Sequence, residues 1–115
     1  MDIHVRSKFW LVDGEGRPVF GQGKEKLLLK IDELGSIRAA ALDLKMSYRA
    51  AWGKIRSTQE RLGVRLIETV AGGGPDRGAK LTDEAWRLLR TFQELQTRGH
   101  QQADALFWEL FGHGT

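Results

Sequence analysis

Residues 36–63 have the spacing of two short helices separated by a tight turn, which constrains the fold more than any other feature of the chain. Ser36 is a good N-cap residue for the first helix. Apolar residues follow it along one helical stripe: Ile37, Ala40, Ala41 and Leu44. Ser47 is a second N-cap, and Gly63 is suited to end the helix that it begins. This pattern predicts a helix-turn-helix motif.

The second of these helices is expected to have one buried face and one open face. Its core positions recur at intervals of three and four residues: Ala51, Ile55, Thr58 and Leu62. A neighbouring stripe that cannot also face the core holds Arg49, Gly53, Arg56 and Glu60. Glycine inside a helix costs roughly 1 kcal/mol relative to alanine. We therefore interpret Gly53 as a position that an outside molecule approaches closely.

Positive charge is concentrated in the middle of the 115-residue chain, although the net charge is only +3. Residues 36–81 hold nine basic and four acidic side chains, whereas residues 1–35 hold six of each and residues 82–115 hold three basic and five acidic. Charge of one sign gathered in one segment is typical of proteins that bind a polyanion. Together with the helix-turn-helix motif, it predicts double-stranded DNA as the partner.

The residues before the motif predict a hairpin and one further helix. Residues 3–12 are rich in β-branched and aromatic side chains, a turn signal follows at 13–16, and residues 17–20 can return as a second strand. Pro18 is expected at the start of that strand or on an edge. Residues 24–34 have helical apolar spacing and end at Gly35. We expect a hairpin over 3–20 and a three-helix core over 24–63.

The residues after the motif predict a wing and a long final helix. A β-rich run, a glycine-rich tip and a return strand make the wing over 64–81, and Thr82 caps a helix over 82–111. Apolar residues, with Gly99 among them, recur by threes and fours from Ala85 to Leu110, close to a coiled-coil seam. The residues expected to pair two copies are Leu88, Phe92, Leu95, Leu106, Phe107, Leu110 and Phe111.

These elements define a mainly α fold: a winged helix-turn-helix with an N-terminal β-hairpin, a β wing and a long C-terminal dimerisation helix. A chain of 115 residues is long enough for one domain with its own core, so residues 1–115 are expected to form a single DNA-binding domain.

Several segments resemble the DNA-binding domain of the molybdate-responsive ModE regulators, which belong with the LysR-type winged helices. They are Ile31-Asp-Glu-Leu-Gly-Ser-Ile37, Met46-Ser-Tyr-Arg-Ala-Ala-Trp52, Leu66-Ile-Glu-Thr69, Gly72-Gly-Gly74 and Leu81-Thr82. The resemblance implies a homodimer joined through the long helix, with the helix that begins at Ser47 in the major groove and the wing beside it. It further implies regulation of genes for molybdate or tungstate transport or for molybdenum enzymes.

The chain departs from the family at three points. Ala85 stands where the family usually has glycine, which is harmless inside a helix. Lys45 stands where the family usually has glycine in the turn, which would put a non-glycine residue at positive φ. Full-length members continue into oxyanion-binding domains, whereas this chain stops at Thr115, so we expect no molybdate-binding domain in it.

The DNA contacts are expected in three groups. Those facing the major groove are Ser47, Tyr48, Arg49, Gly53 and Arg56. Those nearer phosphates are Ser36, Arg38, Lys54, Ser57 and Arg61. The wing would touch the backbone or an adjacent minor groove through Gly73, Arg77 and Lys80. Trp52 is expected to pack in the core, while Tyr48 is left open between packing and stacking on DNA. Two copies would bind an inverted-repeat operator.

Other chemistry has little support in the sequence. There is no cysteine, the three histidines are far apart, and the spacing of Gly73 and Gly78 lacks the lysine of a phosphate-binding loop because Ala79 stands there. We therefore expect no enzyme, cofactor or metal site. No apolar run reaches the roughly 20 residues that span a bilayer, so a cytoplasmic protein is expected. The alternative is a protein-interaction module that recruits a partner through the aromatic C-terminal helix.

Overall fold

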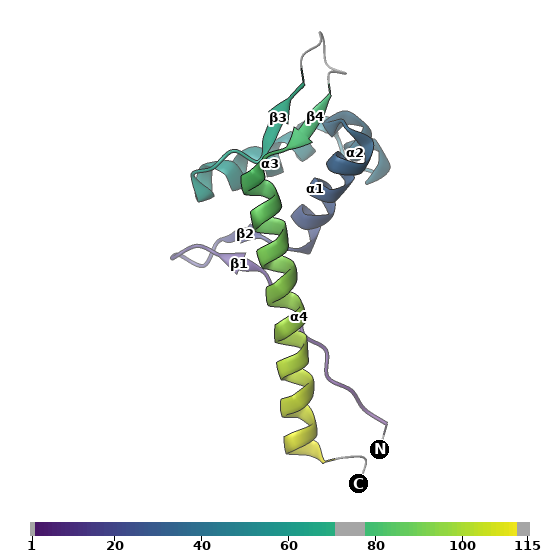
Figure 1. Ribbon diagram of the computed structural model, residues 1–115, viewed down its shortest axis with the longest axis vertical. Helices are drawn as coiled ribbons and strands as arrows, with labels where there is room; N and C mark the ends of the chain where they lie inside the picture. Colours follow the sequence, from purple (N-terminus) through teal and green to yellow (C-terminus); the bar gives the residue numbers. More distant parts are fainter. Residues whose placement is uncertain (1, 71–77, 113–115) are drawn as a thin grey trace.

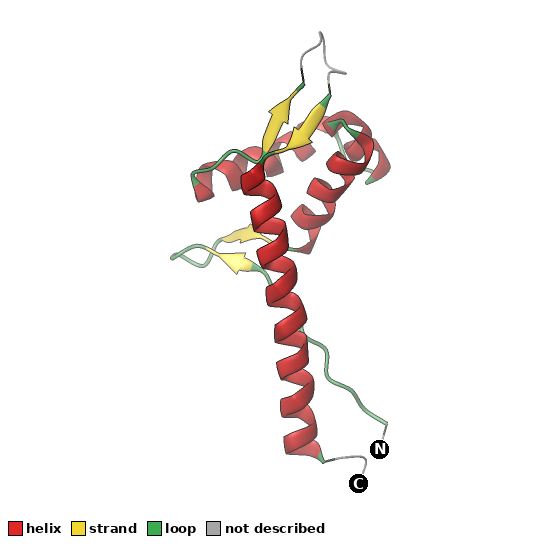
Figure 2. Ribbon diagram, viewed as in Figure 1, coloured by secondary structure: helices red, strands yellow, loops and turns green. Residues whose placement is uncertain are grey.

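The computed structural model describes residues 2–70 and 78–112, in which four helices and two small hairpins follow one another along the chain (Figure 1). The strands are β1 (Leu11–Val12), β2 (Pro18–Phe20), β3 (Ile67–Thr69) and β4 (Ala79–Leu81). The helices are α1 (Gln22–Leu34), α2 (Ile37–Asp43), α3 (Tyr48–Leu62) and α4 (Asp83–Phe111). α4 extends far beyond the other elements, and the molecule measures 63 × 30 × 22 Å (Figure 2).

The helix ends are set by local sequence, as predicted. The Ser36, Ser47 and Thr82 hydroxyl oxygens accept hydrogen bonds from backbone amides at the starts of α2, α3 and α4, at 2.9, 3.0 and 3.1 Å. Each bond satisfies an amide that has no partner within its helix. Gly35 and Gly63 end α1 and α3 in the left-handed region, with φ of 73° and 68°. A side chain there would strain the backbone.

The turn between α2 and α3 places Lys45 at a φ of 59°, and it is the only non-glycine residue at positive φ in the described part of the chain. The Met46 amide donates to the Ala41 carbonyl at 3.0 Å across this turn. The positive φ that the family resemblance implied at Lys45 is therefore confirmed.

The core lies where α1, α2 and α3 meet β2, the wing and the first half of α4. Ala51, Ile55 and Thr58 form the buried face of α3, as the spacing predicted. Leu62 was also expected in the core, but it is 37% exposed because the covered face of α3 ends one turn earlier, at Thr58.

The N-terminal hairpin is shorter than predicted. Its strands are only β1 and β2, with Pro18 at the start of β2, as expected for a residue without an amide hydrogen. Residues 2–10 form no strand, and they run beside the second half of α4 instead (Figure 1). Phe9 lies edge-on to His100 at 5.4 Å, and the Ser7 Oγ lies 2.6 Å from His100 Nδ1. The β-rich composition of this segment therefore reflects packing on a helix.

The wing is an antiparallel pair in which Ile67 faces Leu81 and Thr69 faces Ala79. β3 begins at Ile67 and not at Val64, because the Leu66 amide donates a hydrogen bond to the Gln59 side chain at 2.8 Å and is not available to a strand. At its root, the Ala79 amide donates to the Gly35 carbonyl at 2.9 Å. Gly73 and Arg77, two of the predicted wing contacts, lie outside the described residues.

The observed burial of α4 contradicts part of the predicted coiled-coil seam. Ala85 and Phe92 are 0% and 1% exposed within a single chain, and the Phe92 ring lies edge-on to Phe20 at 5.1 Å. Gly99 lies under the Phe9 ring, where a Cβ atom would collide with it. These three residues face their own chain, so the prediction that Phe92 contacts a second copy is wrong.

Candidate nucleic-acid interface

The outer face of α3 carries basic side chains and one glycine. Arg49, Gly53 and Arg56 are exposed, whereas Ala51 and Ile55 on the opposite face are buried. A Cβ atom at Gly53 would have no neighbour within 4 Å. Packing within the chain therefore does not require a glycine at this position, and the face is open to a molecule from outside.

The N-terminal ends of α2 and α3 are joined by a cation–π contact. The Arg38 guanidinium lies 4.9 Å from the centre of the Tyr48 ring, and Tyr48 is 39% exposed. This contact orients both side chains at the edge of the open face. Trp52 packs against the core, as predicted, and Ser57 is half-buried.

Arg61 is directed to the hairpin and not to the open face of α3. One of its guanidinium nitrogens donates to the Pro18 carbonyl at 3.2 Å and lies 3.4 Å from the Asp13 carboxylate. That carboxylate also accepts the backbone amide of Arg17 at 3.0 Å, and this bond is the main cause of the lowered pKa of Asp13. Asp13 is 48 residues from Arg61, and nothing in the sequence predicted the contact. We leave Arg61 out of the proposed DNA contacts.

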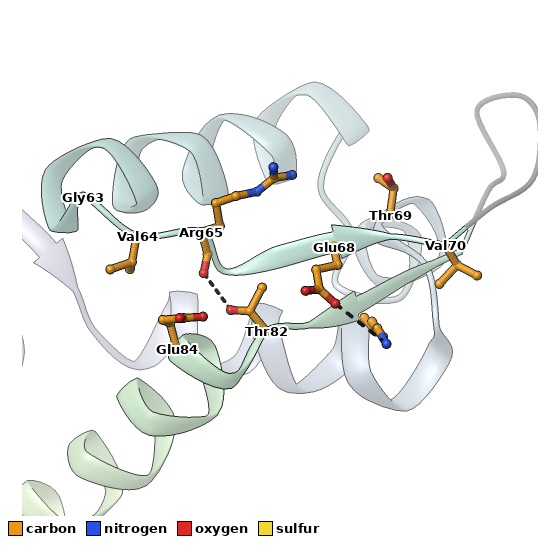
Figure 3. A pocket seen from close by; sticks show the side chains of 9 residues that line it. Gly63, Val64, Arg65, Glu68, Thr69, Val70, Thr82 and Glu84 are labelled. Carbon is orange, nitrogen blue, oxygen red and sulfur yellow. Dashed lines mark hydrogen bonds and ion pairs between the residues drawn. The ribbon is translucent and has the colours of Figure 1, made fainter.

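A hollow of about 810 Å³ lies where α3, the wing and the start of α4 meet (Figure 3). The Thr82 hydroxyl donates to the Arg65 carbonyl at 2.6 Å, and the Lys80 Nζ pairs with the Glu68 carboxylate at 3.8 Å. The exposed Arg65 side chain extends from the base of the wing toward α3 (Figure 3). Sequence reasoning missed Arg65 because it follows the end of α3 and belongs to neither predicted pattern.

The second half of α4 presents apolar side chains to solvent. Leu106, Leu110 and Phe111 are 52%, 69% and 60% exposed. In the first half, Leu95 is 41% exposed, whereas Leu88 is half-buried and packs against the core. Phe107 stacks on Phe111 at 4.9 Å and meets Trp108 edge-on at 5.7 Å. An apolar surface of this kind on a helix is typical of a contact with another protein.

Within residues 2–70 and 78–112, no group of three or more histidine or acidic side chains is arranged to hold a metal ion. None of the described helices is long and apolar enough to cross a membrane.

Three helices with an open basic face on the third, followed by a two-stranded wing, make a winged helix-turn-helix DNA-binding fold. Residues 25–85 match the family described as bacterial regulatory helix-turn-helix protein, lysR family. The chain therefore belongs to the LysR family of bacterial regulatory helix-turn-helix proteins.

Solved structures support the same conclusion. The structure of a CbnR DNA-binding domain in complex with DNA aligns with a TM-score of 0.53 and 26% identity, covering 73% of this chain and 94% of that one. Full-length CbnR complexed with its target DNA aligns with a TM-score of 0.52 and 26% identity, over 72% of this chain and 28% of that one.

The relatives with curated names confirm the resemblance to ModE. The molybdenum transport protein ModE of Herbaspirillum seropedicae is 42% identical over 72 residues, which are 63% of this chain and 27% of that protein. The transcriptional regulator ModE of Haemophilus influenzae is 35% identical over 71 residues, 62% of this chain and 28% of that protein. The matched segments thus span less than a third of the relatives' length.

Proposed function

We propose that this chain is a homodimeric, sequence-specific regulator whose α3 reads the major groove of an inverted-repeat operator. The observation that carries the proposal is the open face of α3, where Arg49 and Arg56 flank a glycine that packing does not require. Arginine is the side chain that most often recognises guanine in the major groove, and a glycine between two arginines lets the helix lie close to the base edges.

The other described contacts are assigned by their position around this face. Ser47 and Tyr48 lie at the start of α3, and Ser36 and Arg38 at the start of α2, where exposed amides favour phosphate. Ser57 and Lys54 lie beside the open stripe, and Lys80 and Arg65 lie on the wing side. We propose that Ser36, Arg38, Lys54, Ser57, Arg65 and Lys80 contact the sugar-phosphate backbone. Such contacts position α3 on the DNA without reading its sequence.

Charge reversal at the open face tests the proposal. Arg49→Glu and Arg56→Glu should each remove specific DNA binding and leave the fold intact, because both side chains are exposed; each base-reading arginine is worth roughly 1–3 kcal/mol. Fluorescence anisotropy on specific and random duplexes measures the effect, and Arg90→Glu, exposed on α4, is the matched control. Wild-type affinity in both variants at moderate salt would exclude this face.

Gly53→Ala gives a milder test in which stability and binding move in opposite directions. Alanine should raise the free energy of unfolding by up to about 1 kcal/mol, because it is the better helix former and has open space here. The added methyl group should weaken specific DNA binding. Equal or tighter binding by the more stable variant would show that DNA does not approach at Gly53.

The homodimer is proposed through the apolar stripe of α4, which is formed by the exposed Leu95, Leu106 and Leu110 and the half-buried Leu88, and through the adjoining Phe107 and Phe111. Analytical ultracentrifugation at micromolar concentration tests it. A monomer that protects a single asymmetric site would reject the dimer and favour a different partner protein at this helix.

The target genes are proposed from the relatives. Those named ModE support a role in regulating molybdate or tungstate transport or molybdenum-enzyme genes. Genome-wide mapping of the bound sites tests this, and sites that lie away from such genes would reject it.

A further inference from the structure

A second hollow lies on the side of α3 that faces the N-terminal hairpin. Its volume is about 360 Å³, and its walls come from four separate parts of the chain: Lys8 and Trp10, β2, residues 21–24 at the start of α1, and Lys54 of α3. We call it the lysine hollow. Apart from Lys54, its lining residues precede residue 25, where the family match begins, so they belong to the part of the chain outside that match.

The lysine hollow carries positive charge without a compensating acid. None of its lining residues is acidic, and Lys8, Lys24 and Lys54 make no ion pair within the described part of the chain. The Lys24 Nζ donates a hydrogen bond to the Val19 carbonyl at 2.9 Å. This bond holds the ammonium group against another lining residue of the hollow. Burial lowers the pKa of Lys24, and the charges of Lys54 and Arg61 lower it further. Like charges gathered in this way are stabilised by an anion.

The start of α1 is shaped to leave this hollow accessible. Gly21 brings its backbone close to Trp10, because a Cβ atom at residue 21 would lie 3.2 Å from the Trp10 Cβ. Gly23 faces open space, and no side chain caps the first turn of α1. The amides of that turn add partial positive charge to the three ammonium groups, while Glu25, the acid of the same turn, accepts a hydrogen bond from Gln96 and does not line the hollow.

The position of the hollow relative to α3 indicates the source of the anion. Lys54 and Arg61, seven residues apart, share the flank of α3 that meets the hairpin, whereas Arg49 and Arg56 lie on the open stripe itself. The hairpin and the wing lie on opposite sides of α3 (Figure 1). A helix in the major groove has a phosphate strand along each flank, so the hollow lies where the strand opposite the wing would run.

We propose that the lysine hollow binds a phosphate of the DNA strand that borders the groove on the side opposite the wing. The hairpin and the residues before it would then form part of the DNA interface, beyond the helix-turn-helix and wing. This inference rests on the proposed DNA-binding function and adds Lys8 and Lys24 to its contacts.

Salt dependence of DNA binding tests the assignment. Lys8→Gln and Lys24→Gln should each make the slope of log affinity against log salt less negative, by up to about one, because a weakened phosphate contact releases fewer counterions. Affinity should fall about threefold to tenfold in low salt, equally on specific and random duplexes. Lys26→Gln, exposed on α1 and outside the hollow, is the matched control and should match the wild type.

The Lys8 variant gives the clearer test of the two. Lys8 is exposed and its replacement removes no described hydrogen bond, whereas Lys24 donates a hydrogen bond to the Val19 carbonyl. Hydroxyl-radical footprints should lose protection on the strand opposite the wing in Lys8→Gln and keep it elsewhere. Unchanged slopes and footprints in Lys8→Gln, with binding lost in Arg49→Glu, would overturn this inference and leave the proposed function standing. Wild-type binding in Arg49→Glu and Arg56→Glu would instead reject the proposed function.

A free anion such as inorganic phosphate is the alternative ligand for the lysine hollow. Inorganic phosphate titrated into the wild-type chain, followed by NMR, distinguishes the two. Shifts confined to the lysine hollow that disappear in Lys8→Gln, with an unchanged salt slope for DNA, would show that the hollow serves a free anion and that the DNA assignment is wrong.

Discussion

The two halves of α4 have the same apolar spacing and opposite surroundings. Ala85, Leu89 and Phe92 in the first half are at most 1% exposed, whereas Leu106, Leu110 and Phe111 in the second half are more than half exposed. Helical periodicity therefore indicates that one face of the helix is to be covered, and it does not indicate by which molecule. In this chain the first half is covered by its own domain, whereas Leu106, Leu110 and Phe111 of the second half stay exposed.

The largest effect is expected from the buried half. Phe92→Ala should lower the free energy of unfolding by about 3–5 kcal/mol, because it leaves a cavity beside Phe20 in the core. Urea denaturation followed by circular dichroism measures this loss, which should be the same at all protein concentrations.

Leu110→Ala is the contrasting variant in the exposed half. Its loss of stability should be small in dilute protein and grow with protein concentration, because binding of a second copy stabilises only the folded state. Urea denaturation at several protein concentrations measures both losses. If the loss of stability depends on protein concentration in the same way for Phe92→Ala and Leu110→Ala, the two halves of α4 do not have different partners.

The exposed half should control binding to paired sites. Leu106→Ser with Leu110→Ser should give a folded monomer that binds a two-half-site operator about 100-fold more weakly, because the second half-site is no longer bound at high effective concentration. Affinity for an isolated half-site should stay at the wild-type level. Sedimentation velocity and anisotropy on both duplexes measure these quantities, and a dimeric double variant would contradict the proposed seam.

Gly99 marks the boundary between the two halves and gives the smallest predicted effect. Alanine in place of a helix-interior glycine is worth about 1 kcal/mol, but at residue 99 its Cβ would collide with the Phe9 ring. Gly99→Ala should therefore be neutral or destabilising in the wild type and stabilising by about 1 kcal/mol in a Phe9→Ala background. A double-mutant cycle measures this coupling, and additive effects would show that residues 2–10 do not pack on α4.

Features set by residues close in sequence could be predicted. The caps at Ser36, Ser47 and Thr82 and the helix ends at Gly35 and Gly63 depend on bonds that span three or four residues. The open face of α3 followed from its spacing for the same reason. DNA contact by its individual residues stays a prediction.

Contacts between distant residues could not be predicted. Phe92 and Phe20 are 72 positions apart, and Phe92 fits a coiled-coil seam as well as it fits a core. Phe9 over Gly99 and Arg61 on Pro18 likewise join segments that no local pattern relates. The lysine hollow was missed for the same reason, because its three lysines come from the N-terminal segment, α1 and α3.

The hydrogen bond from the Ala79 amide to the Gly35 carbonyl has a mechanical consequence. Gly35 ends α1 and directly precedes the cap of α2, so the root of the wing is fastened to the same turn that sets the direction of the helix-turn-helix. This bond therefore fixes the root of the wing relative to the start of α2. If the wing and α2 contact DNA together, as proposed, a groove that does not match the spacing set by this bond can be bound only if the DNA deforms.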